Sequence, residues 1–372
     1  MIISMDECLI KVGIKTKGNP VWEKHEDLTL LKNMLIGDGF HWQQSIQALL
    51  PGNFDPSTLI NTLPMETYLE CVVGSEMNPD SPKEFLKAHA VISRSWALGK
   101  IFDLHHRGHD GKTESPDVLI GWDDTSAHNG FHVCSDDHCQ RYQGLQPIPL
   151  TTLQAIRETA GEVLTNPDGD ILDTRFSKCC GGQTEIFPTC WQSENVKCLE
   201  SFRDPWCDLS GIPTGQRHSV LSSVLKNYDM VTEGYGFRWQ SEISKKEIEK
   251  NLLDRFGRCV GRIKSIEPLH RGPSGRIRLL RIHGTDGYLD LGKELWIRRL
   301  LSPSHLYSSA FDIDDSGDSI RFRGKGWGHG VGLCQIGAAN MALQGFDYKS
   351  ILSFYYPGSV LSKFPLIGRK AD

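Results

Sequence analysis

The sequence predicts an α+β fold of mixed helices and mainly antiparallel strands, arranged as two closely packed lobes with a groove. Helical stripes and strand–turn–strand patterns both occur, but they do not alternate regularly, as a doubly wound parallel sheet requires. The chain has 372 residues, more than one hydrophobic core normally needs. Its content of 39% hydrophobic and 23% charged residues is that of an ordinary globular protein.

A helix is predicted for residues 62–77. Thr62 can cap this helix and Pro64 suits its first turn. Apolar side chains recur at helical spacing from Met65 to Val73, and the next position on that face is Glu76. The carboxyl group of Glu76 is therefore expected at the C-terminal end of an apolar helical face.

A second helix is predicted for residues 81–98, where Ser81 and Glu84 have the spacing of a capping box. Turn residues such as Gly-Pro-Ser-Gly mark the ends of strands further along the chain. The remaining predicted elements are a strand at 8–14, a helix at 150–161, a strand meander at 263–292, a strand at 319–326, and helices at 337–345 and 347–358.

Charge and hydropathy argue against several classes of partner. The net charge of −5 gives no electrostatic case for a nucleic-acid partner. The sequence contains no run of about 18 apolar residues, so it predicts no membrane span. The stretch 1–19 is too polar for a secretory signal, so we expect either a protein that stays inside the cell or one whose signal was removed. Uncharged glycans or small molecules suit this balance.

Eleven cysteines leave both metal binding and disulfide bonding open. The number is odd, and the chain is far longer than the small secreted domains that depend on disulfides. For the vicinal pair Cys179 and Cys180, packing or a distant disulfide is favoured over redox chemistry. The cysteines cluster at positions 134 and 139, at 179 and 180, and at 190, 198 and 207.

Glu76 is the candidate general acid. Desolvation on an apolar face and the negative end of a helix dipole both raise a carboxyl pKa. A carboxyl group with a raised pKa can donate a proton near neutral pH. The alternative is that Glu76 lies beyond the buried stripe as an ordinary exposed residue.

Two thiols and three imidazoles lie within residues 128–139. Thiolates together with imidazole suit Zn²⁺, in a structural or a catalytic site. A disulfide between Cys134 and Cys139, or a surface loop with unrelated histidines, are the alternatives.

The stretch 324–338 is rich in glycine but lacks the Lys-[Ser/Thr] of a phosphate-binding P-loop. Glycine lets the backbone approach a ligand closely, and Gly181 and Gly182 offer the same property in the central segment. Trp327 provides a flat apolar face of the kind on which sugars stack, and His329 provides a proton or a hydrogen bond. The alternative is a glycine-rich turn with a buried tryptophan.

These segments together resemble the SpoIID/LytB family, named for the stage II sporulation protein D and the amidase enhancer LytB. The helix pair "LPMETYLECVVGSEM" and "LKAHAVISRSWAL", the central "SKCCGGQTE" and the C-terminal "GKGWGHGVGLCQIGA" match its motifs in order. The match spans roughly residues 60 to 360. We therefore expect a strand-rich segment at 1–58, a family-like domain at 59–360 with an unplaced insert at 208–262, and a tail at 361–372.

The resemblance implies a lytic transglycosylase that cleaves peptidoglycan glycan strands, in particular those stripped of stem peptides. Its catalytic acid maps to Glu76, and a single carboxyl suffices because the sugar's own 6-hydroxyl attacks C1 to give a 1,6-anhydro product. The resemblance also implies a location in the cell envelope or periplasm. The substrate-binding residues expected in the groove are Arg94, Ser177, Gly181, Gly182, Trp327, His329 and Gln335.

Some family members carry a zinc motif, His-x5-Cys-x5-Cys. The resemblance therefore assigns Zn²⁺ to His128, Cys134 and Cys139, although the second spacing here is one residue shorter. His132 and His138 are kept as substitute ligands. A further departure is Phe176, which stands where relatives can carry a tyrosine whose hydroxyl assists the reaction.

Two other functions compete with the transglycosylase. The first is a non-catalytic glycan-binding protein that enhances a partner amidase, and the glutamate at position 76 favours the enzyme over it. The second is a zinc-dependent hydrolase that uses residues 128–139. Chelation separates this second alternative from the others, because a structural zinc affects stability before turnover.

Overall fold

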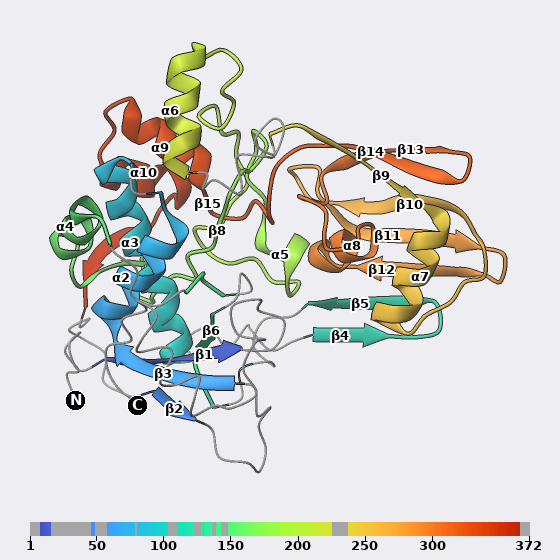
Figure 1. Cartoon of the computed structure of the whole chain (residues 1–372), viewed down its shortest axis with the longest axis horizontal. Helices are drawn as coiled ribbons and strands as arrows, with labels where there is room; N and C mark the ends of the chain where they lie inside the picture. Colours follow the sequence, from blue (N-terminus) through green and yellow to red (C-terminus); the bar gives the residue numbers. More distant parts are fainter. Residues whose placement is uncertain are drawn as a thin grey trace.

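Most of the helices gather on one side of the molecule, above a small sheet, and the other main sheets lie on the other side with further helices packed against them (Figure 1). This mixture of helices and mainly antiparallel strands confirms the predicted α+β fold class. This computed structural model describes residues 8–15, 46–48, 58–78, 80–102, 111–122, 128, 130–135, 139–142, 148–224 and 237–364. No helix within these ranges is long and apolar enough to cross a membrane.

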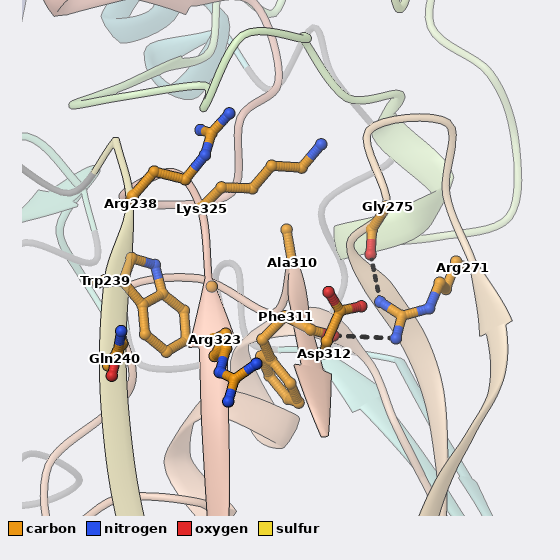
Figure 2. A pocket seen from close by; sticks show the side chains of 11 residues that line it. Arg238, Trp239, Gln240, Arg271, Gly275, Ala310, Phe311, Asp312, Arg323 and Lys325 are labelled. Atoms are coloured by element: carbon orange, nitrogen blue, oxygen red, sulfur yellow. Dashed lines mark hydrogen bonds between the residues drawn. The ribbon is translucent and has the colours of Figure 1, made fainter. Parts of the chain in front are cut away.

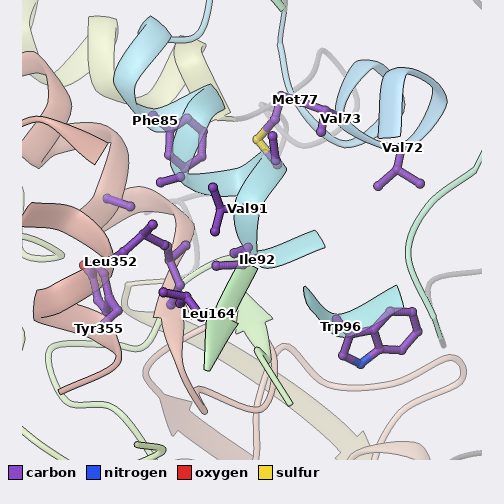
Figure 3. Close-up of a cluster of buried hydrophobic side chains, with 14 of the residues drawn as sticks. Val72, Val73, Met77, Phe85, Val91, Ile92, Trp96, Leu164, Leu352 and Tyr355 are labelled. Atoms are coloured by element: carbon purple, nitrogen blue, oxygen red, sulfur yellow. The ribbon is translucent and has the colours of Figure 1, made fainter. Parts of the chain in front are cut away.

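The helical lobe packs helices from the first third of the chain against helices from its last third. Helix α3 (Lys83–Ile101) lies between α2 (Met65–Glu76) and the pair formed by α9 (Gln335–Leu343) and α10 (Tyr348–Tyr355). Their apolar faces form one continuous core, because the 3.6-residue period places each helix's large side chains on the inner side. Figure 3 shows part of this core, with side chains from α2, α3 and α10.

The two predicted helix starts differ from the structure. Thr62 lies in strand β3 (Thr58–Pro64), opposite Lys11 of β1 (Leu9–Lys15), so Pro64 and not Thr62 precedes the first turn of α2. Pairing with a strand from the chain's beginning is a tertiary contact that local pattern does not reveal.

The predicted capping box at Ser81 and Glu84 is also wrong. Pro82 occupies the cap of α3, and no side chain caps it. Glu84 instead accepts hydrogen bonds from Lys87 at 2.8 Å and from the backbone N–H of Tyr348 at 2.9 Å. Glu84 therefore connects α3 to the start of α10.

The sheet lobe is built on the predicted meander, which is confirmed as β10 (Ile263–Arg271), β11 (Ile277–Gly284) and β12 (Tyr288–Gly292). Strands β5 (Val118–Trp122) and β4 (Gly111–Glu114) extend this sheet beyond β12. The first third of the chain thus contributes two strands to a sheet formed mainly by the last third, which ties the two lobes together.

The sheet lobe has a hydrophobic core separate from that of the helical lobe, as the predicted two lobes require. Helices α7 (Lys245–Phe256) and α8 (Glu294–Leu300) contribute to it. The other elements are β2 (Ile46–Ala48), β6 (Val133–Cys134), α4 (Leu150–Glu158), β7 (Glu162–Thr165), β8 (Phe176–Ser177), α5 (Phe187–Cys190), α6 (Thr214–Val224), β9 (Trp239–Ser244), β13 (Phe311–Ser316), β14 (Ser319–Gly324), β15 (Leu333–Cys334) and β16 (Val360–Lys363).

The buried guanidinium of Arg276 joins three loops where the lobes meet. Its Nε and Nη2 donate to the carbonyl of Gly328, at 3.1 and 2.9 Å. Its Nη1 donates to the carbonyl of Cys180 at 3.2 Å and to the hydroxyl of Ser274 at 2.9 Å. One cation therefore joins the turn before β11, the central "SKCCGGQTE" segment and the glycine-rich loop of residues 324–338.

Two glycines of the loop make room for this guanidinium. A Cβ at Gly330 would lie 2.5 Å from Cζ of Arg276, and one at Gly326 would lie 2.7 Å from its Nη2. Both residues also adopt positive φ, at +77° and +82°. The sequence suggested that such glycines admit a ligand, whereas these two admit a side chain of the protein itself.

Glu185 of the central segment completes the junction. Its Oε2 accepts hydrogen bonds from the hydroxyl of Ser274 at 2.5 Å and from its backbone N–H at 3.2 Å. Ser274 thus lies between a buried carboxylate and the buried Arg276, which places compensating charges on either side of one hydroxyl.

Replacing Gly330 with alanine should destabilise the protein more than the same change at Gly345. Both glycines have positive φ, but a Cβ at Gly345 would have no atom within 4 Å. We expect Gly345→Ala to lower the free energy of unfolding by about 1 kcal/mol, from backbone strain alone. Gly330→Ala should lower it by about 3 kcal/mol or more, because the methyl group also displaces Arg276. Urea denaturation measures both, and equal losses would contradict this account of Arg276.

Candidate functional site

A cavity of about 390 Å³ lies between the lobes, and side chains from distant parts of the chain line it. Glu76 comes from the end of α2 and Ser177 from β8. The sheet lobe contributes the charged residues Glu294, Arg298 and Arg299 of α8. Six of the predicted site residues line this one cavity, namely Glu76, Cys139, Ser177, Trp327, His329 and Gln335.

Glu76 is half-buried at the last residue of α2. The apolar face of this helix ends one turn earlier, so its carboxyl reaches the cavity rather than the core. Its Oε1 accepts a hydrogen bond from the backbone N–H of Arg141 at 2.9 Å. This bond orients the carboxyl group from a second chain segment.

Trp327 is held through its backbone. Its N–H donates to the carbonyl of Cys179 at 2.7 Å, and its own carbonyl accepts the N–H of Cys179 at 3.0 Å. The indole packs edge-on against Tyr307, with ring centroids 5.1 Å apart, and remains partly exposed in the cavity. It therefore presents a fixed aromatic surface.

His329 is neutral at pH 7. Burial, followed by the positive charges of Arg175 and Arg276, lowers its pKa to about 3. Its Nδ1 accepts the N–H of Val331 at 3.0 Å, and the ring also hydrogen-bonds the backbone of Phe176. The imidazole is thus fixed by the protein backbone, which favours a packing role over proton transfer.

Gln335 supports the cavity wall through a buried histidine. Its amide nitrogen donates to Nε2 of His89 at 3.3 Å, and Nδ1 of His89 lies 3.1 Å from the hydroxyl of Ser93. Burial, with a smaller contribution from the charge of Lys178, lowers the pKa of His89 to about 3. A neutral imidazole therefore links α3 to α9.

Ser177 differs from its neighbours. Its side chain is 6% exposed, and its hydroxyl has no hydrogen-bond partner within the described ranges. A buried hydroxyl without a hydrogen-bond partner lowers the free energy of unfolding by about 1–3 kcal/mol. Because Ser177 lines the cavity, a ligand that enters can supply the missing partner.

Arg94, Gly181 and Gly182 do not line this cavity. The Arg94 guanidinium is fully buried, bound by both carboxylate oxygens of Glu66 at 2.7 and 2.8 Å and by the carbonyl of Glu162 at 2.9 Å. A Cβ at Gly181 would lie 2.8 Å from the backbone nitrogen of Gly326. These contacts give Arg94 and Gly181 structural roles, and we do not carry these three residues into the proposed site.

Sequence reasoning missed the positive charge of the site. One of its cations, Arg175, has its guanidinium 4.3 Å from the ring centroid of Trp191 and is itself paired with Asp173, at 2.7 and 3.0 Å. The "RFSK" run around Ser177 was the available signal. The lining contains five cationic side chains, Arg141, Arg175, Lys178, Arg298 and Arg299, against the two carboxylates Glu76 and Glu294.

His128, Cys134 and Cys139 form a cluster that could hold a metal ion. Their ligand atoms all lie within 4.8 Å of one another, and Nε2 of His128 is 3.2 Å from the sulfur of Cys139. His132 is not a substitute, because its Nδ1 accepts the N–H of Lys11 at 3.0 Å. His138 lies outside the described residues. Imidazole and thiolate ligands at this separation fit a zinc-type ion.

A larger cavity, of about 920 Å³, lies in the sheet lobe away from Glu76. Arg238, Arg323 and Lys325 surround it, while Arg271 donates to the carbonyls of Gly275 and Phe311 (Figure 2). It contains none of the predicted site residues. We therefore place the candidate site in the smaller cavity, where a carboxyl group, aromatic surfaces and an unpartnered hydroxyl meet.

Two protein families match separate regions of this chain. Residues 55–166 match the family described as "Stage II sporulation protein", and residues 185–332 match a domain of unknown function, DUF8618. An uncharacterized protein of Brachyspira hyodysenteriae is 28% identical over 94% of this chain and 77% of its own length.

Two Bacillus subtilis proteins are also similar. Stage II sporulation protein D is 25% identical over 82% of this chain and 76% of its own length. The amidase enhancer is 22% identical over 95% of this chain, which spans 48% of that relative. The resemblance stated from the motifs is thereby confirmed at modest identity.

The buried, neutral His89 should make the protein sensitive to acid. Because its folded-state pKa of about 3 lies below the ordinary 6.5, the unfolded chain binds the proton first as pH falls. The stabilisation is complete above pH 6.5 and is lost as pH falls toward 3. Between pH 7 and pH 5 this residue alone should cost about 2 kcal/mol.

The measurement is urea denaturation at both pH values. His89→Gln should reduce the loss between them by about 2 kcal/mol, whereas His218→Gln, at an exposed histidine, should leave it unchanged. The same loss in all three proteins would show that His89 does not titrate in this way.

Proposed function

We propose that this chain, a relative of the SpoIID/LytB proteins, is a lytic transglycosylase that cleaves the glycan strands of peptidoglycan. One observation carries the proposal: the carboxyl group of Glu76 reaches a cavity whose other walls include Ser177 and Trp327. The relatives' names support a cell-wall role, since they refer to sporulation and to an amidase enhancer.

A single working carboxyl supports the transglycosylase over a hydrolase. The second carboxylate that lines the cavity, Glu294, is 1% exposed, lies 3.3 Å from a guanidinium nitrogen of Arg298 and accepts the N–H of Ser309 at 3.3 Å. It is committed to this buried pair. A glycoside hydrolase typically needs two carboxyl groups, whereas intramolecular attack by the substrate needs one.

Glu76 acts first as acid and then as base. Its proton passes to the glycosidic oxygen as the bond from C1 of N-acetylmuramic acid breaks, and the leaving sugar departs as an alcohol. The resulting carboxylate then accepts the proton of the same sugar's 6-hydroxyl as that oxygen bonds to C1. The product carries a 1,6-anhydro ring, no water is consumed, and Glu76 ends protonated as it began.

The cationic lining supports strands without stem peptides as the substrate. Removing the peptide exposes the lactyl carboxylate of N-acetylmuramic acid, and Lys178 and Arg299 lie on the cavity wall where such a group can bind. Trp327 offers a surface for a sugar ring, and the Ser177 hydroxyl offers a hydrogen bond.

We further propose that the cluster of His128, Cys134 and Cys139 holds a structural Zn²⁺. A zinc ion with soft ligands supplies a rigid cross-link between loop segments. Cys139 is two residues from Arg141, whose N–H orients Glu76. These three ligands would therefore fix the position of the acid without taking part in the reaction.

Glu76→Gln should lower turnover strongly while leaving the fold intact. The amide keeps the shape of the side chain but cannot donate the proton, so turnover should fall by about two to four orders of magnitude. Glu70→Gln, on the same helix and outside the cavity, is the matched control and should retain full activity. Release of 1,6-anhydro products from peptide-free strands, followed by mass spectrometry, is the assay.

Two results would count against the assignment. Equal activity of Glu76→Gln and wild type would remove Glu76 from the reaction. Strand binding without cleavage by the wild-type protein would favour the competing function, a glycan-binding enhancer of a cell-wall amidase.

Ser177→Ala should separate binding from stability. Removal of a hydroxyl that lacks a partner should leave the free energy of unfolding unchanged or raise it by up to about 3 kcal/mol. Loss of its hydrogen bond to the glycan should raise KM by about tenfold. Thermal unfolding and steady-state kinetics test both expectations, and a destabilised variant with unchanged KM would assign Ser177 a structural role.

A further inference from the structure

A second set of side chains that could hold a metal ion converges in the core of the helical lobe, outside the cavity. It comprises Cys180 of the central segment, Asp204 and Cys207 of the following loop, and Cys334 at the start of α9. All four are buried, with at most 1% of each exposed. We propose that these residues bind a structural Zn²⁺, distinct from the cluster around Cys139.

The separations fit one ion better than a disulfide. The four ligand atoms lie within 4.8 Å of one another, with the sulfurs of Cys207 and Cys334 3.4 Å apart and the sulfur of Cys180 3.2 Å from Oδ2 of Asp204. Two thiolates on a tetrahedral zinc, each about 2.3 Å from it, lie about 3.8 Å apart. The sulfurs of a disulfide lie about 2.05 Å apart.

The protein holds the Asp204 carboxylate ready for an ion. Its Oδ1 accepts the backbone N–H groups of Trp206 at 2.9 Å and Cys207 at 3.2 Å. Its Oδ2 faces the thiols and accepts the hydroxyl of Tyr355 at 2.9 Å. Such outer hydrogen bonds orient a metal-binding carboxylate.

The surroundings of Cys334 are equally specific. Its sulfur accepts the N–H groups of Cys180 at 3.3 Å and Gly337 at 3.5 Å, so it caps α9. A Cβ at Gly337 would lie 2.1 Å from the hydroxyl of Tyr355 and 2.7 Å from Oδ2 of Asp204. Only glycine leaves room for this carboxylate and phenol.

Charge and ligand type also favour a cation. Within the described ranges the hydrogen-bond donors to Asp204 are neutral groups. A buried carboxylate surrounded by thiols is costly without a positive charge, and Zn²⁺ supplies two. Three cysteines and one carboxylate give four ligands, the number of a closed structural site.

This ion would tie three segments together. Cys180 lies three residues after Ser177, and Cys334 directly precedes Gln335. Both Ser177 and Gln335 line the cavity, so the proposed ligands are close in sequence to its wall. The ligands themselves do not line the cavity. The site therefore acts on the shape of the cavity and takes no part in the chemistry there.

The test is the metal content of the purified full-length chain, measured by mass spectrometry for wild type and for Cys139→Ser. The Cys207→Ser substitution, introduced into the wild-type protein and into the Cys139→Ser variant, should lower the zinc content of each by one equivalent per chain. Cys259→Ser, at an exposed cysteine, is the matched control and should change nothing. A folded Cys207→Ser protein with undiminished zinc would overturn the proposal.

A second experiment serves if Cys207→Ser does not fold. In the native wild-type protein, a chelator should increase alkylation of Cys180, Cys207 and Cys334, identified by peptide mapping. Unchanged alkylation, or a disulfide between any two of these residues, would also overturn the proposal.

The fourth ligand can be tested separately. Asp204→Asn should weaken zinc affinity by about tenfold or more, while Cys179→Ser should retain it. Cys179 lies 3.4 Å from the sulfur of Cys207 but outside the four-ligand group. The reverse result would replace Asp204 with Cys179 and overturn the ligand set proposed here.

Discussion

The guanidinium of Arg276 is the interaction on which the rest of the structure depends. It comes from the sheet lobe and binds carbonyls of the central segment and the glycine-rich loop, both of which pack on the helical lobe. Loss of one partner of a buried charged network costs about 3–5 kcal/mol, so this contact fixes how the lobes meet. Gly326 and Gly330 follow from it, because side chains there would displace the cation, whereas a Cβ at Gly332 would meet the carbonyl of Arg175.

The cavity exists because segments remote in sequence meet at this junction. Glu76 belongs to a helix near the start of the chain, while Trp327 belongs to a loop near its end. Each is held by backbone contacts, through Arg141 for Glu76 and through Cys179 for Trp327. An acid fixed in this way, beside a cationic wall, suits a reaction in which the substrate supplies its own nucleophile.

Sequence patterns that extend over only a few residues correctly predicted the helices and turns that depend on such short-range interactions. The apolar stripe identified α2 and its continuation to Glu76, and turn residues identified the meander, since both signals lie within a few residues. The motif resemblance also placed Ser177 and Gln335 in one group, and both line the cavity. The start of α2 was missed because Thr62 pairs with Lys11, which is a long-range contact.

Other features depended on tertiary neighbours that no spacing reveals. Arg94 could not be recognised as the buried partner of Glu66, nor Gly330 as the space for Arg276. The convergence of Cys207 and Cys334 likewise joins positions 127 residues apart. Buried polar networks of this kind are fixed by the fold as a whole, and so they emerge only once the fold is known.

The central claim is that the substrate's own hydroxyl, and not water, attacks C1. The most direct test is digestion of peptide-free glycan strands by the wild-type protein in water enriched in oxygen-18, with the products read by mass spectrometry. The account predicts 1,6-anhydro ends that contain no heavy oxygen. Reducing ends that carry one heavy oxygen would show hydrolysis and contradict it.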